Sequence, residues 1–270
     1  MRRRKHLFGS KCFAARAVVG GTTLLASLLI AVGSAHGSGL PTPALSEVPV
    51  PVPPAAVVAP APAPPEPAAP VAQARPAPRA IPGGEQYVIS DKELCSTGFA
   101  VTAANGQGGF VSAGHCGERG DAVQNPDGAA IGTFAASNFP GTDYGWVVTN
   151  ERFAATPMVS RHNGTAVAVH GDAPASIGAP VCMSGRASGW HCGTITAVNQ
   201  TVEYDQGLVS GLTATSVCSD GGDSGGAFVS GDQAQGIVSG GIGDCASDGT
   251  TYFQPVGPIL TAYGLTLRTS

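Results

Sequence analysis

The chain contains few cationic residues from residue 81 onward. Residues 81–270 hold six Lys and Arg residues against sixteen Asp and Glu residues, whereas residues 1–80 hold eight basic and two acidic residues. Binding to nucleic acid or to an anionic membrane surface depends on a cationic surface. The acidic composition of residues 81–270 therefore argues against both kinds of partner.

The sequence also lacks a long, uninterrupted apolar run. Its best candidate extends from about Ala17 to Val32, behind the basic start "MRRRKHLFGSK", and is interrupted by Gly20 and Gly21. A membrane-spanning helix needs about 20 apolar residues, whereas a basic head and a short apolar segment that ends in small residues are typical of an export signal. We predict a signal peptide over residues 1–36 and a protein secreted to the medium or the cell envelope, with no membrane span after cleavage. An uncleaved anchor is the alternative.

No Cys-x-x-Cys pair occurs, and the seven cysteines do not cluster. Zinc sites usually need such pairs, so a metal site is disfavoured, and we expect no cofactor. Cys12 lies in the predicted signal, which leaves an even set in the remainder. An even set in an exported chain is typical of disulfides, here three, formed by Cys95, Cys116, Cys182, Cys192, Cys218 and Cys245.

Residues 37–80 contain fourteen of the twenty-two prolines, in runs such as "PVPPAAVVAPAPAPPEP". This composition favours extended polyproline II and does not form a core. We predict a disordered pro-segment or stalk that is too proline-rich to serve as a folding template. Residues 81–270 are then expected to fold unaided as one domain, and the Ala80–Ile81 junction is a predicted cleavage site.

Residues 81–270 consist of short runs rich in Val, Thr, Ile and Phe, such as "GGFVSAG", "YGWVVTN" and "GTITAVNQTVEY", separated by glycine-bearing turns. This pattern predicts an all-β fold of antiparallel strands, in a sandwich or barrel. Only "GPILTAYG" departs from it, because Pro258 suits a first helical turn and Gly264 suits a helix end. The sequence therefore predicts one short helix near the carboxyl terminus.

Three polar residues stand out in the turns between these runs. "FVSAGHCGERG" places His115 after a strand, "NFPGTDYGWVV" places Asp143 before one, and "GGDSGG" places Ser224 in a turn without bulk. A serine hydroxyl is a poor nucleophile unless a base takes its proton, and a base of this kind is oriented by a third group. Each residue alone is common in turns, but the order His, Asp, Ser is much more specific.

The stretches "SAGHC", "TDYG", "GGDSGG" and "VSGG" resemble the chymotrypsin-like serine peptidases, and "PVCMSGRASGWHCGTITAVNQTV" resembles their bacterial α-lytic protease and streptogrisin branch. The resemblance covers Ile81 to about Leu267. It implies a trypsin-like fold of two six-stranded antiparallel β-barrels with the active site between them. It also implies a secreted, monomeric endopeptidase that cleaves protein or peptide substrates through an acyl-enzyme.

The resemblance also assigns roles to individual residues. It implies that His115, Asp143 and Ser224 are catalytic, and that the N–H groups of Gly222 and Ser224 form the oxyanion hole. It pairs Cys95 with Cys116, Cys182 with Cys192, and Cys218 with Cys245, and it has Ser239 donate a hydrogen bond to Asp143. The substrate-binding residues that it implies are Ser219, Val238, Ser239, Gly240, Gly241 and Ile242. None of these is charged, so we expect cleavage after apolar residues.

One position departs from the branch. Its members place an arginine after the cysteine that corresponds to Cys182, where it pairs with the buried aspartate before the serine, but here that position is Met183. A buried carboxylate without a partner is costly. We therefore expect Arg186 to pair with Asp223, or else the amino group that cleavage before Ile81 would release.

Two other functions use the same residues. A non-catalytic binding module on a Pro/Ala stalk could keep this fold, but all three triad residues are present. An esterase could use the same triad, but the strand-to-helix elbow typical of those enzymes is absent around Ser224. Both are weaker hypotheses than an endopeptidase.

Overall fold

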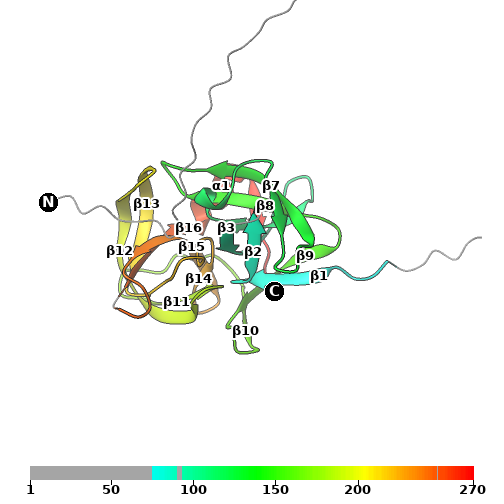
Figure 1. Ribbon diagram of the computed structural model, residues 1–270. Helices are drawn as coiled ribbons and strands as arrows, with labels where there is room; N and C mark the ends of the chain where they lie inside the picture. Colours follow the sequence, from blue (N-terminus) through cyan, green and yellow to red (C-terminus); the bar gives the residue numbers. More distant parts are fainter. Residues whose placement is uncertain (1–74, 90–92, 248) are drawn as a thin grey trace, which may run out of the picture. The chain divides into compact units, whose positions relative to one another are not determined.

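The computed structural model describes residues 75–89, 93–247 and 249–270 (Figure 1). The predicted signal peptide, and the predicted pro-segment as far as residue 74, lie outside the described residues. Among the residues described, no helix has the length and apolar character that crossing a membrane requires.

Six strands of the carboxyl-terminal half form a closed antiparallel barrel in the order β11-β12-β13-β16-β15-β14. Its interior is filled by apolar side chains that alternate along the strands, among them Phe228 and Phe253, whose ring centroids are 4.8 Å apart. The strands are β11 (Pro180–Gly185), β12 (Gly189–Tyr204), β13 (Gly207–Thr215), β14 (Ala227–Ser230), β15 (Gln233–Ile242) and β16 (Thr250–Pro255).

Seven strands of the amino-terminal half and β17 from the carboxyl end form an antiparallel sheet in the order β17-β4-β5-β8-β7-β6-β2-β3. Tyr87 and Ile89 alternate with less buried neighbours along β2, so that one face of the strand enters a core that also contains Phe110 and Phe134. The strands are β2 (Gln86–Ile89), β3 (Glu93–Ser96), β4 (Ala100–Ala103), β5 (Gly108–Ser112), β6 (Ala122–Gln124), β7 (Ala130–Asn138), β8 (Tyr144–Thr149) and β17 (Leu265–Leu267).

A third, smaller sheet contains the start of the described chain. Strand β1 (Arg79–Gly83) pairs in parallel with β9 (Phe153–Ser160), and β10 (Ala166–Ala168) pairs with β9 in the antiparallel sense. The predicted cleavage junction between Ala80 and Ile81 lies inside β1, because Arg79 and Ala80 already pair with β9.

The predicted helix is α1 (Val256–Tyr263), and it ends at Gly264, whose φ of +60° favours glycine. Val256 and Ile259 are the buried residues that attach α1 to the core. The prediction of an all-β, trypsin-like fold with a short carboxyl-terminal helix is confirmed. The sheet that contains β2 to β8 has eight strands instead of the expected six. Strand β17 extends it at one edge, beside β4, and β3 extends it at the opposite edge, beside β2.

Three disulfides connect these elements. One joins β3 to the short 3-10 turn η1 (Gly114–Cys116), one links the paired strands β11 and β12, and one closes the loop after β13 onto the loop after β15. The bonds are Cys95–Cys116, Cys182–Cys192 and Cys218–Cys245.

Candidate active site

His115 lies in η1, directly after β5, and its backbone is held from two sides. Cys116 ties the turn to β3 through its disulfide, and the Ser137 hydroxyl donates to the Gly114 carbonyl at 2.8 Å. Only glycine fits at position 114, because a Cβ there would lie 2.2 Å from the Asn138 carbonyl oxygen. The His115 ring therefore projects from a turn with little freedom to move, and its side chain is only 9% exposed.

Asp143 lies just before β8 and is completely buried. The His115 N–H donates to its Oδ1 at 3.0 Å, and the Ser239 hydroxyl donates to its Oδ2 at 2.6 Å. The Asp143 N–H in turn donates to Oε1 of Gln254 at 3.1 Å. Ser239 and Gln254 belong to β15 and β16 of the closed barrel, so Asp143 is fixed by groups from both halves of the fold.

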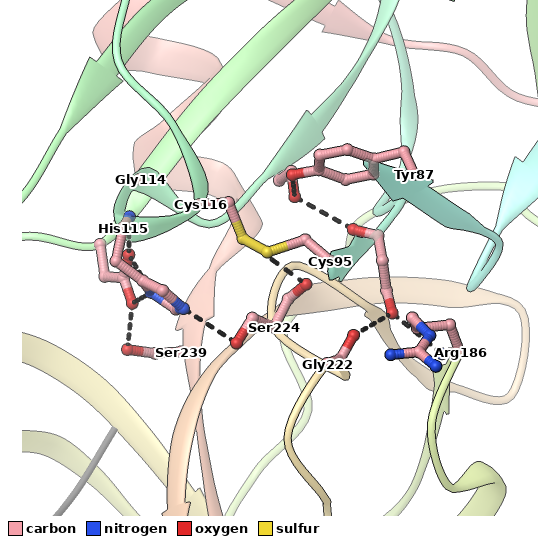
Figure 2. Close-up of a disulfide and its surroundings, with 12 residues drawn as sticks. Tyr87, Cys95, Gly114, His115, Cys116, Arg186, Gly222, Ser224 and Ser239 are labelled. Carbon is pink, nitrogen blue, oxygen red and sulfur yellow. Dashed lines mark hydrogen bonds and ion pairs between the residues drawn. A yellow bond between two sulfur atoms is a disulfide. The ribbon is translucent and has the colours of Figure 1, made fainter. Parts of the chain in front are cut away.

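The side chains of Asp143, His115 and Ser224 form one line of hydrogen bonds. Figure 2 shows the bond between His115 and Ser224. Nδ1 of His115 lies 2.8 Å from Asp143 Oδ2, and Nε2 lies 2.8 Å from Ser224 Oγ. An ionised carboxylate only accepts hydrogen bonds, so Nδ1 of the neutral ring carries the proton. Nε2 is then free to accept the proton of the Ser224 hydroxyl.

The turn before Ser224 leaves two backbone donors free. Gly222 has a φ of +107°, which favours glycine, and its carbonyl accepts a hydrogen bond from the Ser96 hydroxyl at 2.8 Å. The Ser224 carbonyl accepts one from the Ser96 N–H, also at 2.8 Å. Within the described part of the chain, the N–H groups of Gly222 and Ser224 donate to no other group. Two free N–H groups beside a nucleophile are suited to hold a developing oxyanion.

Asp223 does not pair with Arg186, so that prediction is wrong. The buried carboxylate instead accepts hydrogen bonds from the N–H groups of Ala187, Ser188 and Asp220 at 2.8, 3.1 and 2.9 Å, and from the Ser188 hydroxyl. Hydrogen bonds to an ionised group are about twice as strong as neutral ones, so four of them offset much of the cost of burial without a cation.

Met183, at the position where the branch has arginine, belongs to the barrel core. It is fully buried in the barrel core, in a cluster with Val181 and Phe228. Methionine has no charged donor to offer Asp223. The loop between β11 and β12 supplies neutral donors in its place.

Replacing Ser188 with alanine should remove the one side-chain donor to Asp223. We expect the free energy of unfolding to fall by about 1.5–3 kcal/mol, because the lost bond is to a buried charged group. Urea unfolding at neutral pH measures this. The matched control is Ser247→Ala, since that hydroxyl donates to the exposed carboxylate of Asp244 and its loss should matter far less. Equal effects from both variants would contradict this account of Asp223.

The residues predicted to bind substrate lie in or beside β15. The Ser219 side chain is buried, and its hydroxyl lies 2.9 Å from that of Thr251. Because Thr251 donates to the Val217 carbonyl, Ser219 is the donor in this pair. Val238 is 2% exposed and packs in the core cluster of the barrel. Ser239 is buried on Asp143, whereas Ile242 is 43% exposed at the end of β15. The remaining two predicted residues, also in β15, are Gly240 and Gly241.

Three residues of this region were missed by sequence reasoning, namely Thr251, Gln254 and Tyr204. The Tyr204 hydroxyl lies 3.2 Å from Ser239 Oγ, and since Ser239 donates to Asp143, Tyr204 is the donor to Ser239. Burial raises the pKa of Tyr204, so its hydroxyl stays protonated. The available signal was weak, because it consists of polar residues at inward-facing positions of otherwise apolar strands.

One group of possible metal ligands occurs among the described residues. Ligand atoms of His191, Cys218 and Cys245 lie within 4.8 Å of one another. The two cysteines form a disulfide, so their sulfurs are not available as thiolates. This group therefore does not constitute a metal site.

The sequence and the fold are similar to those of known serine proteases. The trypsin family model matches residues 86–262. Streptogrisin-C of Streptomyces griseus is 49% identical over 203 residues, which are 74% of this chain and 44% of that protein, so the chain spans about half the length of this curated relative. The structure of Thermobifida fusca Protease A is 49% identical with a TM-score of 0.67, and all of it aligns with 71% of this chain. The structure of Nocardiopsis protease is 51% identical with a TM-score of 0.67, and all of it aligns with 70% of this chain. The chain therefore belongs to the trypsin family of serine proteases, in its streptogrisin and α-lytic protease branch.

Proposed function

We propose that this chain is a serine endopeptidase that hydrolyses peptide bonds through an acyl-enzyme. One observation carries the proposal: Asp143, His115 and Ser224 are joined by hydrogen bonds of 2.8 Å each, and Ser224 stands beside two free N–H groups. Family membership supports the same function. A binding module would not need to preserve this line of bonds.

The geometry supports a two-step reaction. Ser224 Oγ attacks the carbonyl carbon of the substrate while its proton passes to Nε2 of His115. The oxyanion that forms accepts hydrogen bonds from the N–H groups of Gly222 and Ser224. The imidazolium, stabilised by Asp143, then gives the proton to the leaving amine, and an ester to Ser224 remains. Water attacks this ester with His115 again as the base, which releases the new carboxyl end and restores the serine.

An activity-based probe tests the reaction class. A fluorophosphonate should label Ser224, and the modified residue can be located by mass spectrometry; the heat-unfolded protein is the control. Labelling with hydrolysis of peptides supports the endopeptidase. Labelling with hydrolysis of esters alone would favour the esterase, and absence of labelling would favour the binding module.

We further infer that the enzyme cleaves after apolar residues. None of the residues proposed to bind substrate is charged, and the buried hydroxyls of Ser219 and Thr251 are already bonded to each other. A charged side chain buried there would lack a partner. In a peptide library, apolar residues before the cleaved bond should exceed acidic and basic residues by at least about tenfold in kcat/KM. A profile dominated by Arg, Lys or Glu would refute this assignment.

We also infer that the protein is exported and acts on protein or peptide substrates as a monomer. The basic, then apolar amino-terminal sequence and the three disulfides support export, since disulfides persist in oxidising compartments. Cleavage at Ala80–Ile81 stays a prediction. It would require access to a bond inside β1.

A further inference from the structure

The side chain of Arg186 lies beside the proposed oxyanion hole, although it does not reach Asp223. A Cβ on Gly222 would lie 2.5 Å from Nη1 of Arg186, so the guanidinium packs directly against this glycine. In Figure 2, Arg186 and Ser239 lie on opposite sides of Ser224. Arg186 therefore flanks the nucleophile on the side away from β15.

The backbone of Arg186 is held in place by the same groups that hold Gly222. Its N–H donates to Ser96 Oγ at 2.9 Å, and that hydroxyl donates to the Gly222 carbonyl. The next two residues, Ala187 and Ser188, donate to Asp223. The backbone that carries this side chain is thus held close to Gly222, which lowers the conformational entropy that the loop would lose when a substrate binds.

The charge of Arg186 is not neutralised within the described part of the chain. Nε is buried and has no hydrogen-bond partner, and no described carboxylate forms an ion pair with the guanidinium. This is unusual in a segment where acidic residues outnumber basic ones by sixteen to six. A partly exposed, unpaired guanidinium at the edge of a reaction site is suited to bind a carboxylate, often with two parallel hydrogen bonds.

The position of Arg186 indicates which part of a substrate it would meet. In the proposed function, the residues before the cleaved bond lie along Ser239, Gly240 and Gly241 of β15. The residues after the bond must then leave on the opposite side, over Gly222 and the Cys95–Cys116 disulfide. An extended peptide advances about 3.3 Å per residue, so Arg186 is within reach of the first or second residue after the bond.

We propose that Arg186 is a specificity-determining residue that binds the carboxylate of an Asp or Glu side chain at one of the first two positions after the cleaved bond. The inference rests on the proposed function and adds a preference for the residues that follow the cleaved bond. The preferred substrates are then acidic on the carboxyl-terminal side of the cleaved bond and apolar on the other side.

The test uses internally quenched peptides with amidated ends that differ only by Glu, Gln or Lys at one of these two positions. At one of them, kcat/KM for Glu should exceed that for Gln by about tenfold, as expected for a charge-assisted bond. In Arg186→Gln the ratio should fall to about one, and in Arg186→Glu the preference should shift to Lys. Each ratio is measured within one enzyme, which cancels a general change in activity.

Arg161→Gln is the matched control. Arg161 is exposed and its guanidinium lies over the Trp190 ring, 5.3 Å from the centroid, so this variant loses the same charge from a side chain that packs on Trp190 instead of on Gly222. It should keep the ratio of Glu to Gln. If the Arg186 variants do not fold, the unmodified protein is assayed at different salt concentrations instead. Its ratio of kcat/KM for Glu to that for Gln should decrease between 0.05 and 1 M NaCl, because the Debye length falls to about 3 Å at 1 M.

Equal cleavage of the Glu and Gln peptides, or an unchanged ratio in Arg186→Gln, would overturn the proposal. Failure to cleave any peptide would instead overturn the proposed function. In that case the dissociation constants of the same peptides test the role of Arg186. A Glu peptide that binds about tenfold more tightly than its Gln counterpart would support binding of the carboxylate by Arg186, and equal binding would contradict it.

Discussion

Replacing Ser224 with alanine should lower kcat for a peptide substrate by on the order of 10⁶-fold, a magnitude borrowed from another serine protease. The variant lacks the nucleophile, so no acyl-enzyme forms, and His115 and Asp143 have no proton to transfer. The free energy of unfolding should change little, because the substitution removes one hydroxyl and adds no bulk to the turn. Single-turnover kinetics and urea unfolding measure the two quantities.

Ser230→Ala provides the control for this experiment. Ser230 follows on β14, and its hydroxyl donates to the Pro180 carbonyl, away from His115. Its activity should stay within about twofold of the unmodified protein, as for other substitutions remote from a site. Residual activity of Ser224→Ala within about tenfold of the unmodified protein would mean that Ser224 is not the nucleophile.

Replacing Asp143 with asparagine should lower kcat by about 10⁴-fold, the magnitude found for this change in the chymotrypsin-like enzymes. The amide would present a donor toward Nδ1 of His115, which favours the tautomer that carries its proton on Nε2. Nε2 could then no longer accept the proton of Ser224. KM should change far less than kcat, because Asp143 is buried and has no contact with substrate.

Asp127→Asn is the matched control for Asp143→Asn. Asp127 is exposed, and its carboxylate pairs with Arg79 at 3.3 Å on the surface. Its kcat should stay close to that of the unmodified protein. If Asp143→Asn retained more than a tenth of kcat, Asp143 would be only a structural anchor for η1 and β15.

The residues of the candidate site were predictable because turn chemistry is local. His115, Asp143 and Ser224 each stand in a short motif with characteristic neighbours, and the resemblance extended the reading to Gly222 and the disulfides. The partners of Asp223 were not predictable in this way. Three of its four donors are backbone N–H groups. Every residue except proline carries such a group, so the residue types do not indicate which of them donate to Asp223.

The fold shows the same division between local and distant contacts. The glycine-punctuated strands and the helix between Pro258 and Gly264 follow from local preferences, and both are present. The parallel pairing of β1 with β9 and the attachment of β17 to β4 join segments far apart in the chain. Such pairings depend on packing in the complete fold, as do the contacts of Tyr204 with Ser239 and of Gln254 with Asp143.

The anchoring of Asp143 by both halves of the fold has a consequence during biosynthesis. A ribosome releases His115 and Asp143 well before Ser224, Ser239 and Gln254, so a growing chain holds the base and its carboxylate without the nucleophile or the groups that orient them. Even after Ser224 has emerged, Asp143 lacks the Gln254 contact until β16 has joined the closed barrel. Peptide hydrolysis should therefore begin only after β16 has joined the barrel, and chains that stop before Gln254 should be inactive.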